Sequence, residues 1–247
     1  MLRSVARQRT PPQEIVIADD GSGTSTIAVI ESFARVHSAP VRLVQQPHEG
    51  FRVARLRNLA IAAATCDYLV FIDGDMLLHE AFMADHVRFA RRGHYTQGVR
   101  LHADAALTAR LIAAPADFPT VSTPGLGGLR RAYLLQSAAL GGLLRYAANG
   151  FIALKACNLG AWREDLVRVN GFNEDMIGWG PEDKELCARL EHAGVRRQTL
   201  LFGGIACHLH HPPAARSALQ TNLAILSATR ASRRVRAEHG LERHLRA

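Results

Sequence analysis

Two clusters of acidic residues, far apart in the chain, have the types and spacing to do chemistry. The first, Asp73-Gly74-Asp75, directly follows the apolar run 68–72, which is typical of a buried strand in a parallel sheet. Because alternate residues of an extended chain point to one side, Asp73 and Asp75 can present both carboxylates to one cation. Oxygen ligands at a strand's carboxyl end favour Mg²⁺ or Mn²⁺ holding a phosphate, although the pair could instead shape a solvent-exposed turn.

The second cluster lies in the segment 179–185, whose sequence is WGPEDKE. It places Glu182 and Asp183 in the first turn of a predicted helix. Asp183 shares a helix face with apolar residues 186, 187 and 190, so its carboxylate is expected to point inward. An inward acid favours a general base. The plainer interpretation is a helix N-terminal charge that contributes about 0.3–1 kcal/mol.

The size and composition of the chain limit the classes of protein it can be. Its 247 residues suffice for one large α/β domain or two small ones. The net charge of +8 indicates anionic partners such as nucleotides, phospholipid headgroups or acidic glycans. Nucleic acid is not expected, because the basic residues are scattered and only 6% of residues are aromatic. Four widely spaced cysteines are typical of reduced cytoplasmic thiols, and no apolar run reaches the roughly 18 residues of a spanning helix.

Strands and helices are expected to position these clusters. The first 75 residues predict strands at 14–19, 41–45 and 68–73, and helices at 24–36 and 53–64. This alternation predicts an α/β fold with a mixed, mainly parallel sheet flanked by helices. Asp19, Asp20, Asp73 and Asp75 then fall at the carboxyl edge of the sheet, where ligands bind.

The later segments are less regular. Proline and glycine in residues 104–128 predict a flexible excursion rather than a packed element. Residues 129–147 predict a helix interrupted at Gly141-Gly142, whose leucines either bury in the domain or meet lipid. Residues 214–247 predict a basic helical tail, which is either a solvated face or a membrane or glycan contact. The expected sections are 1–103, 104–147, 148–213 and 214–247.

Several motifs occur in an order that resembles family 2 glycosyltransferases. They are Asp19-Asp20-Gly21-Ser22, Gly50-Phe51-Arg52 with Arg57-Asn58, Asp73-Gly74-Asp75, Asn170-Gly171-Phe172-Asn173-Glu174-Asp175, and the segment 178–183. The later part resembles the galactosyltransferase-type C-terminal module of chondroitin polymerases and β-1,4-galactosyltransferases. The resemblance spans residues 1–213. It implies a GT-A fold and inverting transfer of a sugar from a nucleoside diphosphate, most simply UDP, with divalent Mn²⁺ or Mg²⁺.

The resemblance also implies roles for single residues on the donor side. Asp20 is expected to contact the nucleobase, with Asp19 beside it, and Arg57 to lie near the nucleotide. Asp73 is expected on the ribose or metal side, and Asp75 as the metal ligand. Asp19 and Asp20 could alternatively form an Asx turn and cap the next helix.

The remaining roles concern the metal and the acceptor. His208 resembles a histidine metal ligand, and strand alternation would put His210 on the same side, facing the acceptor; which of His208, His210 and His211 binds metal stays open. The resemblance implies that Asp183 is the catalytic base and that Glu182, beside it, contacts the acceptor. Trp179, followed by Gly180, is either core or a stacking floor for a sugar.

The resemblance implies an enzyme of bacterial surface polysaccharide synthesis that acts on a glycan or lipid-linked acceptor. The cysteine pattern predicts a cytoplasmic location, with a peripheral membrane contact as an alternative. The family normally begins with a strand that is missing here, because residues 1–8 already read as the end of the following helix. A start upstream of Met1 is therefore expected. A non-catalytic remnant, a nucleotidyltransferase and a basic nucleic-acid-binding protein are the rival classes.

Overall fold

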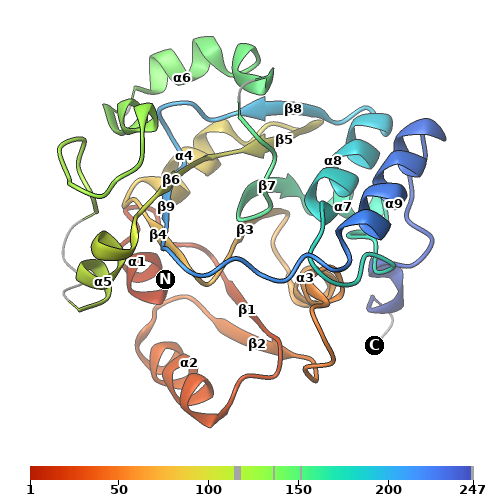
Figure 1. Ribbon diagram of the computed structural model, residues 1–247, viewed down its shortest axis with the longest axis horizontal. Helices are drawn as coiled ribbons and strands as arrows, with labels where there is room; N and C mark the ends of the chain where they lie inside the picture. The colour runs from red at the N-terminus through yellow and green to blue at the C-terminus, as the bar shows by residue number, and fades with distance from the viewer. Residues whose placement is uncertain (114–117, 136, 151, 246–247) are drawn as a thin grey trace. The chain divides into compact units, whose positions relative to one another are not determined.

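The chain divides into two compact units, each built from three stretches of sequence. Figure 1 shows the computed structural model, which describes residues 1–113, 118–135, 137–150 and 152–245. The first unit contains Met1–Pro11, Val70–Ala161 and Arg197–Pro213; the second contains Pro12–Leu69, Trp162–Arg196 and Ala214–Ala247.

The second unit begins with a parallel βαβ arrangement. Its elements are β1 (Ile15–Asp19), α2 (Thr24–Val36), β2 (Val41–Gln45) and α3 (Val53–Ala63). β1 and β2 pair in parallel, with Asp19 opposite Gln45, and α3 packs on both strands. The turn after β1 requires Gly21, because its φ is +76° and a Cβ there would lie 2.8 Å from the backbone nitrogen of His48. The predicted strands and helices of residues 14–64 are confirmed.

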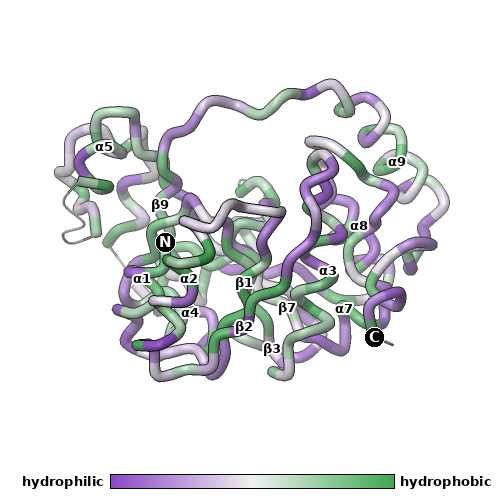
Figure 2. The backbone as a smooth tube through the Cα atoms, turned by 90° about the horizontal axis from the view of Figure 1, so that it is seen from below, coloured by the Kyte–Doolittle hydropathy of each residue, from purple (hydrophilic) through white to green (hydrophobic). Residues whose placement is uncertain are grey.

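Three further helices complete the second unit: α7 (Arg163–Arg168), α8 (Glu182–His192) and α9 (Leu219–Ala231), followed by the 3₁₀ turn η3 (Leu241–Arg243). α8 and α9 lie side by side (Figure 1). Figure 2 draws α8 mostly in the colour of hydrophilic residues, yet most of its side chains are buried. Glu185 and Arg189 are fully buried as an ion pair with 2.6 Å between Oε2 and Nη2, which explains how so polar a helix is tolerated in the interior.

The C-terminal segment 214–247, predicted as a basic helical tail, is helical only in part. α9 ends at Ala231, and Arg233 has a φ of 51°, a left-handed conformation that a helix cannot continue through. Arg236 reaches the carbonyl oxygens of Val167 and Arg168 instead of lying on a helix. The tail therefore packs on its own unit. None of the helices described is long and apolar enough to cross a membrane.

The first unit carries two small sheets. Strands in the order β3, β7, β5, β8 form one sheet, with β3 (Tyr68–Ile72), β7 (Asn158–Trp162), β5 (His94–Gln97) and β8 (Arg196–Thr199). β4 (Met76–Leu78), β9 (Ile205–His208) and β6 (Val99–His102) form the other. β9 is antiparallel to β4 and parallel to β6. The predicted strand at 68–73 is confirmed, and the predicted mixed sheet includes antiparallel pairs.

Helices and turns accompany these sheets: α1 (Leu2–Ala6), α4 (Phe82–Phe89), α5 (Ala105–Ala113), η1 (Leu129–Leu135), α6 (Ala138–Leu144) and η2 (Ala147–Gly150). The prediction that residues 104–128 form no packed element is wrong. Asp104 Oδ1 accepts a hydrogen bond from the backbone nitrogen of Leu107 and starts α5, and Leu107 and Leu126 are buried in one apolar cluster with β6 and β9. Residues 114–117 lie outside the described residues.

The predicted break at Gly141-Gly142 is also wrong, because both glycines lie within α6. A Cβ on Gly141 would lie 2.4 Å from the carbonyl oxygen of Leu201, so the glycine permits a close approach rather than a break. The leucines of this segment divide: Leu134 packs against the apolar cluster, whereas Leu143 is 78% exposed.

A buried polar pair ties α4 to the strands of the first unit. His86 and Asn158 are both fully buried, and His86 Nε2 lies 2.9 Å from Asn158 Oδ1. Asn158 Nδ2 donates to the carbonyl oxygens of Val99 and Gly204, so Oδ1 must accept from the imidazole. Burial lowers the pKa of His86 to about 4, since the charged ring would lose its hydration.

This pair predicts an acid-sensitive stability. Between pH 6.5 and about 4 the unfolded state binds a proton that folded His86 does not, so the free energy of unfolding falls as the pH drops through this window. The loss approaches about 3 kcal/mol. His86→Gln keeps a donor for Asn158 but cannot titrate, so urea unfolding of that variant should depend less on pH. Equal pH slopes for the two proteins would contradict this assignment.

Candidate functional site

The first unit brings one carboxylate and two imidazoles together. Asp75 precedes β4, and the antiparallel pairing of Met76 with His208 places it beside the end of β9. Asp75 Oδ2 lies 3.2 Å from His208 Nε2 and 3.1 Å from His211 Nε2. One ligand atom from each of the three residues lies within 4.8 Å of the others. This spacing suits a single metal ion.

The electrostatics of the group favour a cation. Burial pushes the pKa of Asp75 upward, but the hydrogen bond and charge of His208 and the charge of His211 outweigh it and hold the pKa below its usual value. The other oxygen, Asp75 Oδ1, is buried without a hydrogen-bond partner, and an ion could satisfy it. One carboxylate with two imidazoles fits Mn²⁺ better than Mg²⁺, because imidazole suits the softer transition metals. These residues therefore fit the metal that the resemblance implies.

Two residues expected near the metal are not members of this group. Asp73 is not one of the three clustered residues, although its carbonyl oxygen closes the turn to Met76. β9 ends at His208, so the predicted strand alternation does not extend to His210, whose backbone nitrogen donates to Thr108 Oγ1 and whose side chain is exposed. The structure brings His211 to Asp75 instead.

In the second unit, the two acids after β1 have defined partners. Asp19 Oδ2 accepts from the backbone nitrogen of Ser22 and from Gln45, and these bonds hold the pKa of Asp19 below its usual value against the upward effect of burial. The Asx-type turn is therefore present, but Gly23 caps α2 without a side-chain bond. Asp20 Oδ1 accepts from Gln46 Nε2 at 2.6 Å.

The second oxygen of Asp20 lies 2.8 Å from His48 Nδ1. The Asp20 side chain is only partly buried, at 29% exposure. Gln46 and His48 thus fix the orientation of the carboxylate while part of it stays accessible to a ligand.

Arg57 and Asn58, adjacent on α3, have different partners. Arg57 Nη1 donates to Glu182 Oε1 at 2.7 Å, and both side chains are nearly buried. Burial raises the pKa of Glu182, as does neighbouring Asp183, and Arg57 partly offsets both. Asn58 is fully buried and exchanges hydrogen bonds with the backbone of Phe172, so it anchors the loop before α8.

Asp183 lies in the first turn of α8 and is 7% exposed. Its face of the helix includes Leu186 and Leu190, both fully buried, as the spacing predicted. Its Oδ1 lies 2.7 Å from the backbone nitrogen of Lys184. The carboxylate thus sits at the positive end of the helix, where an ionised acid is stabilised.

The turn before α8 is held closely against α9. A Cβ on Gly180 would lie 2.4 Å from Asn222 Nδ2, and Asn222 donates to the carbonyl oxygen of Ile177. Trp179 is half-buried, with the guanidinium of Arg216 4.8 Å from its ring centroid. Trp179 is therefore not simple core, and its ring already stacks with a cation.

Sequence reasoning left some contributing residues unassigned. His211 was one of three open choices, and its contact depends on where β9 ends. Gln46, His48 and Asn222 gave no signal, because their partners are distant in the chain or depend on a turn.

Comparison with known protein families matches two parts of the chain. A family model described as "Glycosyl transferase family 2" matches residues 1–113, and one described as "N-terminal domain of galactosyltransferase" matches residues 144–212. The chondroitin synthase of Pasteurella multocida (strain Pm70) is 24% identical over 225 residues, which are 85% of this chain and 23% of that protein. The validoxylamine A glucosyltransferase of Streptomyces hygroscopicus subsp. limoneus is 29% identical over 208 residues, 78% of this chain and 45% of that protein. The chain spans less than half the length of either relative.

Solved structures share the fold at low sequence identity. GalNAc-T7 with UDP, GalNAc and Mn²⁺ aligns with a TM-score of 0.64 at 14% identity, covering 93% of this chain and 44% of that one. S. aureus TarS 1-349 in complex with UDP-GlcNAc aligns with a TM-score of 0.61 at 15% identity, covering 99% of this chain and 64% of that one. The expected GT-A fold is confirmed. The order of motifs, the two family matches and this fold agree: the chain carries a glycosyltransferase family 2 domain over residues 1–113, and its residues 144–212 match the N-terminal domain of galactosyltransferase.

Proposed function

We propose that this chain transfers a sugar, with inversion, from a nucleoside-diphosphate sugar to a saccharide acceptor, and that UDP carries the donor. The observation that carries the proposal is the group of Asp75, His208 and His211, whose donor atoms suit one divalent ion. The solved structures named above, one with UDP and Mn²⁺ and one with UDP-GlcNAc, support the choice of donor.

The donor side rests on residues whose orientation is fixed before any ligand arrives. Asp20 is held by Gln46 and His48, and we assign it to the nucleobase; Asp19 accepts from Ser22 in the adjacent turn. We assign Arg57 to the nucleotide and Asp73 to the ribose. Asp75, His208 and His211 would hold Mn²⁺, which when bound supplies positive charge to the diphosphate as it leaves.

The acceptor side centres on Asp183. The acceptor hydroxyl oxygen attacks the anomeric carbon, the bond from that carbon to the phosphate oxygen breaks, and its electron pair leaves with the diphosphate. Asp183 takes the proton of the attacking hydroxyl, and one base suffices for inversion. Glu182, which is ion-paired with Arg57, would accept a hydrogen bond from a hydroxyl group of the acceptor. The half-buried Trp179, beside Gly180, offers a stacking surface for a sugar ring.

We propose the class of acceptor from the relatives named above. The name of one relative, chondroitin synthase, says that it makes a glycan. This favours a role in bacterial surface polysaccharide synthesis, with a glycan or a lipid-linked saccharide as the acceptor. We assign His210, whose side chain is exposed, to that acceptor. The four cysteines are all free thiols, which favours a reducing compartment such as the cytoplasm.

The direct experiment incubates the purified protein with a panel of nucleotide-sugars and Mn²⁺ and measures the released products. Glycosyl transfer or donor hydrolysis releases UDP, whereas a nucleotidyltransferase would release pyrophosphate. Release of UDP from one or a few donors is expected. Pyrophosphate as the product would overturn the proposal.

The metal group predicts different effects for neighbouring histidines. His211→Ala should weaken Mn²⁺ binding by at least about 10–100-fold, since losing even an outer-shell partner costs that much. Asp75→Ala should remove metal-dependent UDP binding altogether. His210→Ala is the matched control, and calorimetric titration with Mn²⁺ should find its affinity unchanged. Equal losses for His210→Ala and His211→Ala would contradict the assignment.

The proposed base predicts a separation of binding from turnover. Asp183→Asn keeps the shape of the side chain but cannot accept the proton, so kcat should fall by about 10²–10⁴-fold. UDP affinity, measured by titration with Mn²⁺ present, should stay nearly intact. A variant that loses nucleotide binding as well would show that Asp183 has another role.

A further inference from the structure

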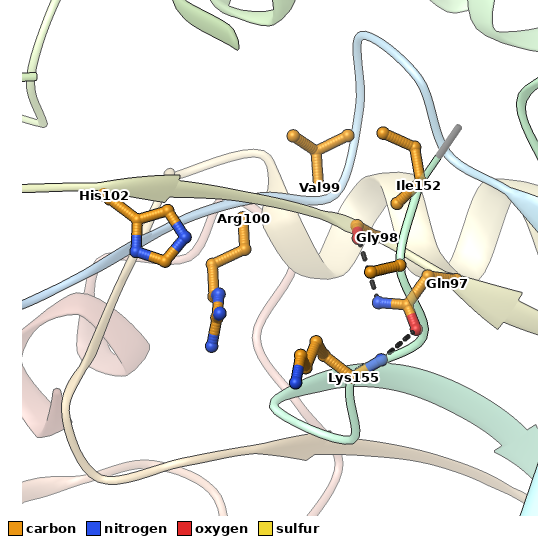
Figure 3. Close-up of a pocket in the computed structure, with 8 residues that line it drawn as sticks. Gln97, Gly98, Val99, Arg100, His102, Ile152 and Lys155 are labelled. Atoms are coloured by element: carbon orange, nitrogen blue, oxygen red, sulfur yellow. Dashed lines mark hydrogen bonds between the residues drawn. The ribbon is translucent and has the colours of Figure 1, made fainter. Parts of the chain in front are cut away.

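The first unit contains a cavity of about 190 Å³ that the proposed function does not use. Its lining includes Gln97, Gly98, Arg100, His102, Ile152 and Lys155, drawn in Figure 3. One buried water needs roughly 10–15 Å³ by a comparable measure, so the cavity has room for a small polar group of a ligand.

The polar amide group of Gln97, at the floor of the cavity, already has its hydrogen-bond partners within the protein. Gln97 is 1% exposed, and its Nε2 donates to the carbonyl oxygens of Gly98 and Asn158, while its Oε1 accepts from the backbone nitrogen of Lys155 (Figure 3). Gly98 has no room for a side chain, since a Cβ would lie 2.0 Å from Asn158 Oδ1. The floor is therefore rigid and offers a neutral ligand few free hydrogen-bonding groups.

The groups left for a ligand are cationic. Arg100 extends from β6 and Lys155 from the loop before β7, and both reach toward the same space (Figure 3). Among the residues that the structure describes, none of those lining the cavity is acidic. Neither Arg100 nor Lys155 forms an ion pair within the part of the chain that the structure describes, and Arg100 Nη1 donates to the Cys157 sulfur at 3.6 Å. Two like charges in a partly enclosed space repel each other, and an anion between them relieves the repulsion.

The cavity adjoins the candidate metal group within the same unit. β6 and β9 pair in parallel, with His102 opposite His208 in register. The two imidazole centroids lie 5.6 Å apart, so His102 both lines the cavity and lies near one residue of the candidate metal group. A substrate held at the metal group can place a second group in the cavity.

We propose that this cavity is an anion subsite, in which Arg100 and Lys155 bind a carboxylate or phosphate of the substrate beside the metal group. The proposal rests on the proposed function for the identity of that substrate, but anion binding itself does not. The anion has two sources, the carboxylate of an acidic sugar or a phosphate of the donor. Guanidinium and ammonium groups bind both through charge-assisted hydrogen bonds.

The test measures binding of glucuronate, inorganic phosphate and neutral glucose to the whole protein in metal-free buffer of low ionic strength. At least one anion should bind at least about tenfold more tightly than glucose. Arg100→Met and Lys155→Met remove a charge but keep an apolar stem, and each should weaken that binding by about tenfold or more, the size of one hydrogen bond to a charged group.

Two further variants serve as controls. Lys155→Arg keeps the charge and should restore anion binding relative to Lys155→Met. Arg110→Met removes an exposed cation of α5, which donates to Pro124 away from the cavity, and should bind anions as the unchanged protein does. Thermal unfolding of all variants shows whether they fold.

The outcomes separate the two sources. Loss of glucuronate binding alone assigns the subsite to an acidic sugar, and loss of phosphate binding alone assigns it to the donor phosphate. Unchanged anion binding in both folded methionine variants, or equal binding of anions and glucose, overturns the proposal. If no nucleotide-sugar releases UDP but anion binding still depends on Arg100 and Lys155, the proposed function fails and the subsite stands.

Discussion

The pairing of β4 with β9 is the constraint on which the candidate metal centre depends. It sets Met76 opposite His208, and the backbone nitrogen of Leu209 then donates to the carbonyl oxygen of Asp75, so the chain on both sides is fixed. A shift of one residue in this register would turn His208 to the other face of the sheet. The chemistry assigned to Asp75 is therefore a consequence of strand pairing between segments far apart in the sequence.

Buried polar networks perform the same task in the second unit. Fully buried Arg189 binds Glu185 and the carbonyl oxygen of Val169, and Thr229 of α9 donates to Glu185. This network fixes α8 between α9 and the loop that follows α7, and with it the position of Asp183. Removing one partner of such a buried pair costs about 3–5 kcal/mol, because the other charge is left uncompensated. Stability and the placement of the proposed base thus depend on the same contacts.

The sequence predicted the local strands and helices well, but it predicted poorly the contacts between residues far apart in the chain. The strands and helices of residues 14–72 follow from apolar periodicity and from turns such as that at Gly21, which are local signals. α5 was missed because its buried partner Leu126 follows a proline-rich stretch, and the left-handed Arg233 gave no signal that the tail would turn back. Among the site residues, Asp75 and His208 were predicted as metal ligands together with Asp73, which is not part of the group. The contact of His211 depends on where β9 ends, which periodicity does not fix.

The central claim is that Asp75, His208 and His211 form one Mn²⁺ site that serves glycosyl transfer. Electron spin-echo spectroscopy of the Mn²⁺-loaded protein with UDP detects nitrogen nuclei bound directly to the ion. The account predicts modulation from the imidazole nitrogens of His208 and His211, reduced but not lost in His211→Ala. Mn²⁺ that binds with UDP but shows no histidine nitrogen would contradict it.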